Sequence, residues 1–247
     1  MRAKPWTCLW KGRMPSGSLG IHYEEESREL PPELLREASA HWESLQGGGQ
    51  VLFDGALSHL LSHSSDKGTL SLKLGRSSYK LWMHSSGRQQ EIEERFGRGT
   101  PSRPLALCVA LIDSEGKLLL QRRSQQVAEG AGLLHVPGGH LDPDLHRQGG
   151  IPCPETAMKA ELREELGLED LFGGELLALI ENLENGKPEL LYRFHTSLDF
   201  QSLLERAARA RDRFEYDSLH FWRPGEKLPP GEIAVPCRAL LERISEV

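Results

Sequence analysis

The segment Lys159–Leu168, KAELREELGL, constrains the fold more than any other stretch, because it combines three carboxylates with three leucines in ten residues. In a helix each residue turns by about 100°, so Glu161, Glu164 and Glu165 share one edge while the leucines face the other side. Gly167 can end such a helix in the left-handed conformation. Like charges at this spacing repel one another by a few tenths of a kcal/mol, so the acidic edge requires either solvent or a bound cation.

Length and composition leave room for a substantial hydrophobic core. The 247 residues allow one large domain or a mid-sized domain with a smaller companion. Hydrophobic residues make up 38% of the chain and charged residues 27%, as is typical of globular proteins. A formal charge of -6 argues against nucleic acid or an anionic membrane as the main partner. A small anionic substrate is compatible with this charge if a local cation attracts it.

No segment has the length and hydrophobicity of a membrane span or a signal peptide. The N-terminal residues MRAKPWTCLWKGRMPSG are partly basic but lack an apolar run, and no apolar stretch of about 18 residues occurs elsewhere. We therefore expect a cytoplasmic protein. The four cysteines, Cys8, Cys108, Cys153 and Cys237, are widely separated and predict neither a zinc site nor a disulfide framework.

Sequence periodicity divides the chain into two parts. Residues 31–46 have helical spacing, and residues 68–82 alternate like a half-buried strand. The polar segment 85–104, with Gly and Pro near its end, is the predicted boundary. We therefore expect an N-terminal extension over residues 1–100 and a second domain over residues 101–247.

The second part contains two predicted β-hairpins. Residues 105–123 form two apolar runs around a tight turn, and residues 175–198 form another pair with Asn-Gly at the turn. Helical segments follow at about residues 201–213 and 236–246. Strands interleaved with a few helices predict an α+β fold in which a mixed sheet is covered on both faces.

A glycine pair precedes the acidic helix. The run GLLHVPGGHLDPD predicts a strand that ends in Pro137-Gly138-Gly139, where bare backbone can turn sharply and approach a ligand. A Gly-Gly loop followed by A-E-x-x-E-E-x-G-U, with U apolar, resembles the box of the Nudix hydrolases, usually written G-x5-E-x7-R-E-U-x-E-E-x-G-U. The residues that match the C-terminal half of the box are Glu161, Leu162, Glu164, Glu165, Gly167 and Leu168.

The first half of the box is degenerate. Ala160 stands where the family has an arginine, so the ion pair that ordinarily orients the acidic residues is absent. Pro152 stands where the family has its upstream glutamate, and extra residues within PDLHRQGGIPCP separate the glycine pair from the helix.

An alternative alignment of the box uses Glu155, Arg163 and Glu164, which fit its first half. This alignment fails downstream, where it places Leu168 and Glu169 at positions that require two glutamates. We therefore keep the first alignment and treat Arg163 as a surface residue.

A larger part of the chain resembles one branch of the Nudix family. The run LLLQRRSQQVAEGAGLLHVPGGHLDP, together with LFDGALSHLLSHS and LSLKLGRSSYKLW, is similar to the uridine diphosphate glucose pyrophosphatases, whose members carry an N-terminal extension and a degenerate box. The motif R-R-S-x-Q-V-A-E followed by V-P-G-G-H is more specific to this branch than the box is. The resemblance implies an α/β/α sandwich with a mixed sheet, preceded by a smaller N-terminal α/β extension that contributes to nucleotide binding.

The resemblance also implies a Mg²⁺-dependent hydrolase that cleaves UDP-glucose or UDP-galactose into UMP and sugar 1-phosphate. Cleavage of a diphosphate requires cations that neutralise its charge and align an attacking water. Magnesium prefers hard oxygen ligands, and Mn²⁺ is the alternative ion. Glu161 and Glu165 are the expected metal ligands, and Glu164 is expected to bind a second ion or to orient the water. These three glutamates are the expected catalytic residues.

Further positions correspond to ligand-contacting residues of the branch. The rings of Phe53 and Tyr79 are expected to enclose uracil, and the Arg123 guanidinium suits a diphosphate or a uracil carbonyl. His140 and Asp142 are expected to reach phosphate or sugar. The other implied positions are Ala128, His135, which replaces an acid of the branch, and Cys237.

Several of these residues have a simpler interpretation without the resemblance. Phe53 would then be a core residue, Tyr79 a packing residue and Arg123 a surface charge at a strand end. A loop histidine such as His140 is usually solvated, and Cys237 fits a buried structural cysteine.

Two other functions remain open. Ala160 and the broken first half of the box favour a nucleotide-sugar binding module without catalysis, and a hydrolase of ADP-sugars or dinucleotides is the second alternative. Retention of all three glutamates favours an enzyme, because a binding module has little need of a self-repelling acidic edge. The expected partner is a small nucleotide-sugar, with neither nucleic acid nor membrane. The sequence does not choose an oligomeric state, nor whether the extra loop at 142–154 is a lid, a specificity element or a passive insertion.

Overall fold

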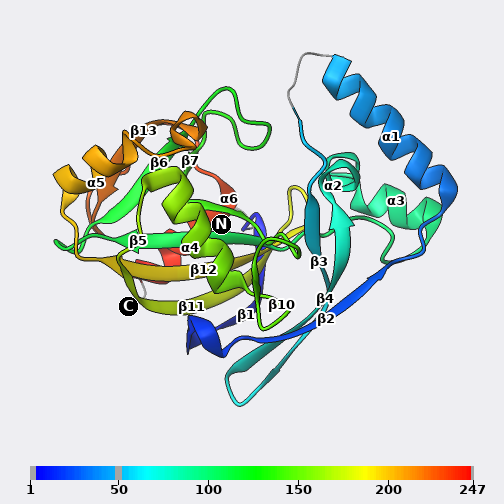
Figure 1. The fold of residues 1–247 in the computed structure, drawn as a ribbon, viewed down its shortest axis with the longest axis horizontal. Helices are drawn as coiled ribbons and strands as arrows, with labels where there is room; N and C mark the ends of the chain where they lie inside the picture. The colour runs from blue at the N-terminus through cyan, green and yellow to red at the C-terminus, as the bar shows by residue number, and fades with distance from the viewer. Residues whose placement is uncertain (1–3, 48–51, 246–247) are drawn as a thin grey trace.

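The computed structural model describes residues 4–47 and 52–245, and its main feature is a large mixed sheet (Figure 1). The strands of this sheet follow the order β1-β11-β12-β5-β6-β13, with β7 and β8 paired onto β6 and β5. The pair β12 and β5 is parallel, and the other pairs are antiparallel. The bounds are β1 (Trp6–Pro15), β5 (Ala106–Ile112), β6 (Leu118–Arg123), β7 (Leu134–His135), β8 (Gly138–His140), β11 (Leu171–Asn182), β12 (Lys187–Thr196) and β13 (Tyr216–Trp222).

Two helices cover the two faces of the large sheet. In Figure 1, α4 (Pro154–Leu166) lies in front of the sheet and α6 (Val235–Ser245) lies behind it. The central strand β5 is therefore almost continuously apolar, as expected for a strand covered on both faces. Its side chains alternate between two cores: Leu107 and Val109 pack with α4, whereas Cys108 and Ala110 pack with α6. The predicted α+β fold with a sheet covered on both faces is confirmed.

The N-terminal part forms a second, smaller unit, at the right of Figure 1. A three-stranded sheet of order β2-β4-β3 is flanked by three helices. The bounds are β2 (Gly20–Ser27), α1 (Pro32–Gly47), β3 (Ala56–Asp66), β4 (Thr69–Ser78), α2 (Tyr79–Ser85) and α3 (Gln89–Phe96). Leu70, Leu72 and Leu74 are buried on one side of β4, in agreement with the predicted alternation.

One strand pairing and one packing contact show how the two units share the N-terminal residues. β1 does not belong to the smaller unit, because it pairs with β11 along the edge of the large sheet. The polar segment 85–104 is not wholly a linker, since α3 forms within it and buries Ile92 against α1 and α2. The described residues before 100 therefore contribute to both units.

The remaining elements lie close to the predicted ones. β11 and β12 form the predicted hairpin, with Asn182 opposite Lys187 and Gly186 in the turn at φ 72°. The helix predicted at 201–213 is shorter, α5 (Phe200–Ala207), and a 3-10 turn, η2 (Arg213–Glu215), follows it. A second 3-10 turn, η1 (Ser16–Ser18), and two short strands, β9 (Arg147–Gln148) and β10 (Ile151–Pro152), complete the described structure. None of the helices within the described ranges is long and apolar enough to cross a membrane.

Candidate active site

The acidic helix α4 has the predicted limits. It begins at Pro154, and Gly167 ends it in the left-handed conformation with φ 67°. The N–H of Gly167 donates to the Arg163 carbonyl, which closes the last turn. Leu162 and Leu166 are fully buried beneath the sheet, so the apolar side of the helix fixes its rotation. The carboxylates on the other edge are held in place by this packing.

The three carboxylates of α4 have different environments. Glu165 is buried, with 1% of its surface exposed, and Glu161 is partly buried. Burial, together with Glu215 and Glu164, raises the pKa of Glu161 to about 8. Burial and the neighbouring Glu161 and Glu215 raise the pKa of Glu165 well above its ordinary value. Glu164 points to the rim, where its carboxylate lies 2.6 Å from Arg211.

Glu215 is a fourth acid of this cluster that the sequence analysis missed. The Tyr216 hydroxyl lies 3.3 Å from the Glu165 carbonyl, and so η2 is held against the end of α4. Burial raises the pKa of Glu215, although Arg123 opposes this effect. A single glutamate about fifty residues beyond the box carries no motif, and only the pairing of β13 with β6 brings it to the site.

Arg123 supplies positive charge to the acidic cluster. It lies at the end of β6, its side chain is 15% exposed, and Nη2 lies 3.6 Å from Glu215 Oε2. It lowers the pKa values of Glu161, Glu165 and Glu215 against the effect of burial. Its Nε donates to the Glu129 carbonyl at 3.0 Å, which fixes the direction of the guanidinium. An arginine from β6 thus compensates in part for the missing arginine of the box.

The glycine pair of β8 packs directly against the acidic helix. A Cβ at residue 139 would overlap the carboxylate of Glu161, with Oε2 at 2.9 Å and Oε1 closer still. A Cβ at residue 138 would overlap the backbone oxygen of Leu107 in the neighbouring strand. Bare backbone at residue 139 lets Glu161 approach the loop, and bare backbone at residue 138 lets the loop pair closely with β5.

The acidic edge fits a divalent cation by its chemistry. Both Glu165 oxygens are buried and lack a hydrogen-bond partner within the part of the chain that the structure describes. A buried carboxylate beside a second one is strongly unfavourable unless a proton or a cation compensates the charge. Across residues 4–47 and 52–245, however, no three acidic, histidine or cysteine side chains lie close enough to enclose an ion as they stand. Glu161 and Glu165 are therefore a preformed pair, and a third ligand would have to turn inward.

Two predicted substrate residues, Tyr79 and His140, lie together. Tyr79 begins α2, and its ring meets that of His140 edge-on at 6.1 Å. Burial lowers the pKa of His140 to about 4, although Glu129, 3.8 Å away, opposes this effect. Burial and Arg123 likewise lower the pKa of His135 to about 3, and its Nδ1 accepts from the Val136 N–H at 2.9 Å. Both histidines are therefore neutral at pH 7.

Glu129 connects the two units of the protein in a network that the sequence analysis missed. Its carboxylate accepts from Trp82 Nε1 at 3.2 Å and lies 2.8 Å from Lys187 Nζ. Burial alone would raise the pKa of Glu129, but Lys187 and His140 lower it to about 2. Glu129 ends the R-R-S-x-Q-V-A-E motif, yet nothing in that motif indicates Trp82 or Lys187 as its partners.

The remaining predicted positions are not brought into either cluster. Phe53 is 85% exposed, and Ala128 is exposed. The Asp142 carboxylate accepts the backbone N–H groups of Asp144 and Leu145 at 2.7 and 3.1 Å, so it stabilises its own loop. Cys237 is completely buried in the core beneath α6, on the face of the sheet opposite α4.

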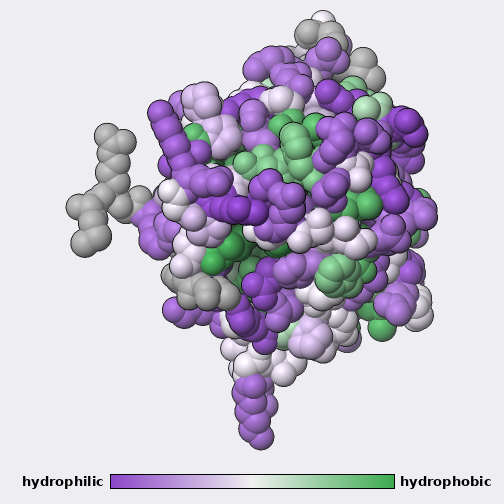
Figure 2. Space-filling model, turned by 90° about the vertical axis from the view of Figure 1, so that its left-hand side faces the viewer, coloured by the Kyte–Doolittle hydropathy of each residue, from purple (hydrophilic) through white to green (hydrophobic). Residues whose placement is uncertain are grey.

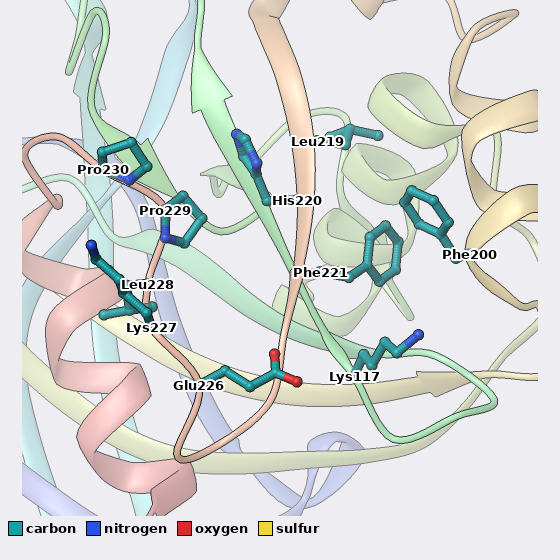
Figure 3. Close-up of a pocket in the computed structure, with 10 residues that line it drawn as sticks. All are labelled: Lys117, Phe200, Leu219, His220, Phe221, Glu226, Lys227, Leu228, Pro229 and Pro230. Carbon is teal, nitrogen blue, oxygen red and sulfur yellow. The ribbon is translucent and has the colours of Figure 1, made fainter.

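An open groove of about 740 Å³ lies elsewhere, along the edge strand β13 (Figure 3). Its lining includes Phe200 and Phe221, whose rings meet edge-on at 4.6 Å, and the segment from Leu228 to Pro230. On the side of the molecule shown in Figure 2, hydrophobic surface gathers in patches bordered by hydrophilic residues. None of the predicted site residues lines the groove.

Sequence comparison relates the chain to known proteins. The sequence model of the NUDIX domain matches residues 101–235. The chain is 34% identical over 153 residues to the uridine diphosphate glucose pyrophosphatase NUDT22 of Mus musculus, covering 54% of this chain and 50% of the relative. It is 31% identical over 186 residues to the Homo sapiens protein of the same name, covering 66% and 59%. The chain thus spans only half to three fifths of the length of these relatives.

The solved structures that resemble the chain are more distant. One is the MutT protein from Methanosarcina mazei Go1, with 19% identity, a TM-score of 0.37 and coverage of 57% of this chain and 92% of that one. A MutT/nudix family protein from Listeria innocua has 20% identity, a TM-score of 0.36 and coverage of 57% and 91%. Because the NUDIX domain model matches more than half of the residues, the chain belongs to the Nudix family.

Proposed function

We propose that this protein hydrolyses the diphosphate bond of UDP-sugars, UDP-glucose or UDP-galactose, to UMP and sugar 1-phosphate with the help of a divalent metal ion. One observation carries the proposal: Glu161 and Glu165 share one helix edge, where the Glu161 carboxylate lies against the bare backbone of Gly139 and both Glu165 oxygens are buried without a hydrogen-bond partner among the described residues. The similarity to the uridine diphosphate glucose pyrophosphatases supports the choice of substrate.

Glu161 and Glu165 would hold the metal ion, Mg²⁺ or alternatively Mn²⁺. Their raised pKa values follow from burial without a sufficient counter-charge, and a divalent cation supplies that charge. The ion would neutralise charge on the diphosphate and make water a better nucleophile. Glu164, 2.6 Å from Arg211 at the rim, is our candidate ligand for a second ion.

Arg123 and Glu215 are our candidates for substrate binding and proton transfer. The Arg123 guanidinium would bind a diphosphate oxygen, since its contact with Glu215 at 3.6 Å is long enough to exchange for a phosphate. Glu215 would accept the proton of the attacking water on its carboxylate, because burial raises its pKa towards the range in which a general base is effective.

The smaller unit and the glycine loop would bind the nucleoside and the sugar. Tyr79 offers an aromatic ring, and the neutral His140 beside it offers a donor and an acceptor. Glu129 fastens this region to Trp82 of the smaller unit. We therefore assign nucleotide binding jointly to residues before 100 and to the Nudix domain.

The test is phosphate-coupled turnover of UDP-glucose with Mg²⁺, compared with ADP-glucose, ADP-ribose and a metal-free control. Metal-dependent release of UMP from the uridine substrate is the expected result. Preference for either adenine substrate would refute the assignment of the base while retaining the acidic-edge chemistry.

A binding module without catalysis is the second candidate, favoured by Ala160 and by the absence of a closed three-ligand cage among the described residues. Glu165→Gln separates the two candidates. In an enzyme, this change reduces turnover of UDP-glucose far more than affinity for UMP, whereas a binding module has no turnover to lose. Affinity is measured by calorimetry with the product UMP, which neither form consumes.

A further inference from the structure

The side chains of β6 alternate between the two faces of the large sheet. Leu119 packs in the core beneath α4, whereas Leu118 and Leu120 pack in the core beneath α6. Because the period of a strand is two residues, Gln121 faces α4, as Arg123 does. The strand therefore directs an amide and a guanidinium at the acidic helix.

Gln121 is held rigidly in the middle of the sheet. Its backbone lies between His135 of β7 and Leu219 of β13, and its side chain is 0% exposed. Neither its amide nitrogen nor its amide oxygen has a hydrogen-bond partner in the described part of the chain. A buried amide without a partner costs about 1–3 kcal/mol, so such a group requires an explanation.

Among the residues that the structure describes, Glu165 lacks hydrogen-bond donors, whereas Gln121 has donors without an acceptor. Its carboxylate is buried and accepts no hydrogen bond from any described residue, although it can accept several. The Gln121 side chain lies close enough to this carboxylate to act on it as a hydrogen-bond donor. Two buried groups, one with spare donors and one with spare acceptors, therefore face each other across the interface between β6 and α4.

We propose that Gln121 is a positioning residue, whose Nε2 donates to the Glu165 carboxylate and aims its second oxygen at the metal ion. The inference rests on the proposed function, because it assumes that Glu165 binds a metal. Ala160 lacks a side chain that could orient the acids from α4 itself, so the orientation has to come from another element. Partners of this kind typically change metal affinity by about 10- to 100-fold.

The test measures Mn²⁺ binding by the loss of the free-ion electron paramagnetic resonance signal, with no substrate present. Gln121→Met keeps the length and volume of the side chain but removes both donors and the acceptor. We expect Mn²⁺ affinity to fall by about tenfold. Leu120→Met is the matched control, since it changes a buried residue of the same strand on the opposite face and should leave Mn²⁺ affinity within twofold of the wild type.

A double-mutant cycle distinguishes positioning from a general structural effect. If Gln121 acts through Glu165, Gln121→Met has no further effect on Mn²⁺ affinity in a Glu165→Gln background but keeps its effect in a Glu161→Gln background. A general loss of structure would instead lower affinity in both backgrounds. Gln121→Asn is the second variant: it keeps an amide but withdraws it by one methylene, and it should weaken binding as Gln121→Met does.

The outcomes separate the two proposals. Equal Mn²⁺ affinity of the wild type and Gln121→Met overturns the role of Gln121 and leaves the proposed function standing. Absence of Mn²⁺ binding by the wild-type protein overturns the metal site of the proposed function, and this inference with it.

Discussion

The contact between the glycine loop and the acidic helix leads to a prediction about Gly139→Ala. A Cβ at residue 139 would overlap Oε1 and Cδ of Glu161, and Oε2 would lie at 2.9 Å. The φ angle of Gly139 is not in the left-handed region, so the backbone itself tolerates alanine. The substitution therefore acts on one carboxylate, which has to move aside by roughly an ångström for ordinary contact distances to be restored.

The two expected effects of Gly139→Ala differ in size. The clash involves the far end of a flexible side chain, and turning it off its rotamer costs about 0.5–1.5 kcal/mol. A displacement of about an ångström at a reacting centre lowers turnover by about 100-fold. We therefore expect a large loss of activity together with a loss of about 1 kcal/mol in the free energy of unfolding.

Gly138→Ala is the matched control, because the added Cβ meets backbone instead of a side chain. The Leu107 carbonyl belongs to β5 and cannot turn away without disturbing its pairing with β8. Overpacking of this kind costs about 1–3 kcal/mol or more. Turnover of UDP-glucose with Mg²⁺ and urea unfolding are measured for both variants. Gly139→Ala with activity within threefold of the wild type, or with a stability loss equal to that of Gly138→Ala, would refute the reasoning.

Three further predictions concern charge. Folding raises the pKa of Glu161 from 4.5 to about 8, so its contribution to the free energy of unfolding is complete below pH 4.5 and is lost as the pH rises to 8. Urea unfolding of the metal-free protein should show this loss of stability, and the loss should be smaller in Glu161→Gln. Lys187→Met leaves Glu129 buried without its cation and should lower the free energy of unfolding by about 3–5 kcal/mol, with partial recovery on adding Glu129→Gln. Arg76→Met removes a partly exposed ion pair with Asp144 and should cost less than about 1 kcal/mol in urea, yet raise KM for UDP-glucose more than it lowers kcat.

The parts of the fold that were predictable depend on local chemistry. The limits of α4 follow from a proline and a glycine, and the β11–β12 hairpin follows from two apolar runs around Asn-Gly. The alternation of β4 follows from burial of one face only. Each of these signals lies within a few residues of the feature that it predicts, so no knowledge of distant contacts is needed.

The parts that were missed depend on pairing between distant segments. β1 joins the large sheet by pairing with β11, and the side chains of the two strands give no signal of this pairing. Tyr216 pairs with Arg123, and this register carries Glu215 to the acidic helix. α3 lies in a polar segment whose few apolar residues gave no helical signal strong enough to outweigh its composition.

The loop at 142–154 illustrates the same limit, since the sequence left open a lid, a specificity element or a passive insertion. In the structure, Arg76 Nη1 donates to the Asp144 carboxylate of this loop at 2.7 Å, and Arg147 Nη1 lies 3.0 Å from the Glu25 carboxylate. Arg76 and Glu25 both belong to the smaller unit, so this loop of the Nudix domain forms a bridge between the two units. Asp142, which we expected at the ligand, caps the first turn of this bridge.

The position of the bridge explains why an exposed ion pair can matter for binding. Arg76 lies three residues before Tyr79 on one side, and Asp144 lies four residues after His140 on the other. The rings of Tyr79 and His140 meet across the boundary between the two units at 6.1 Å. A contact that contributes little to the free energy of unfolding therefore holds the spacing of two groups that are proposed to bind one substrate, and its loss should appear in KM before it appears in stability.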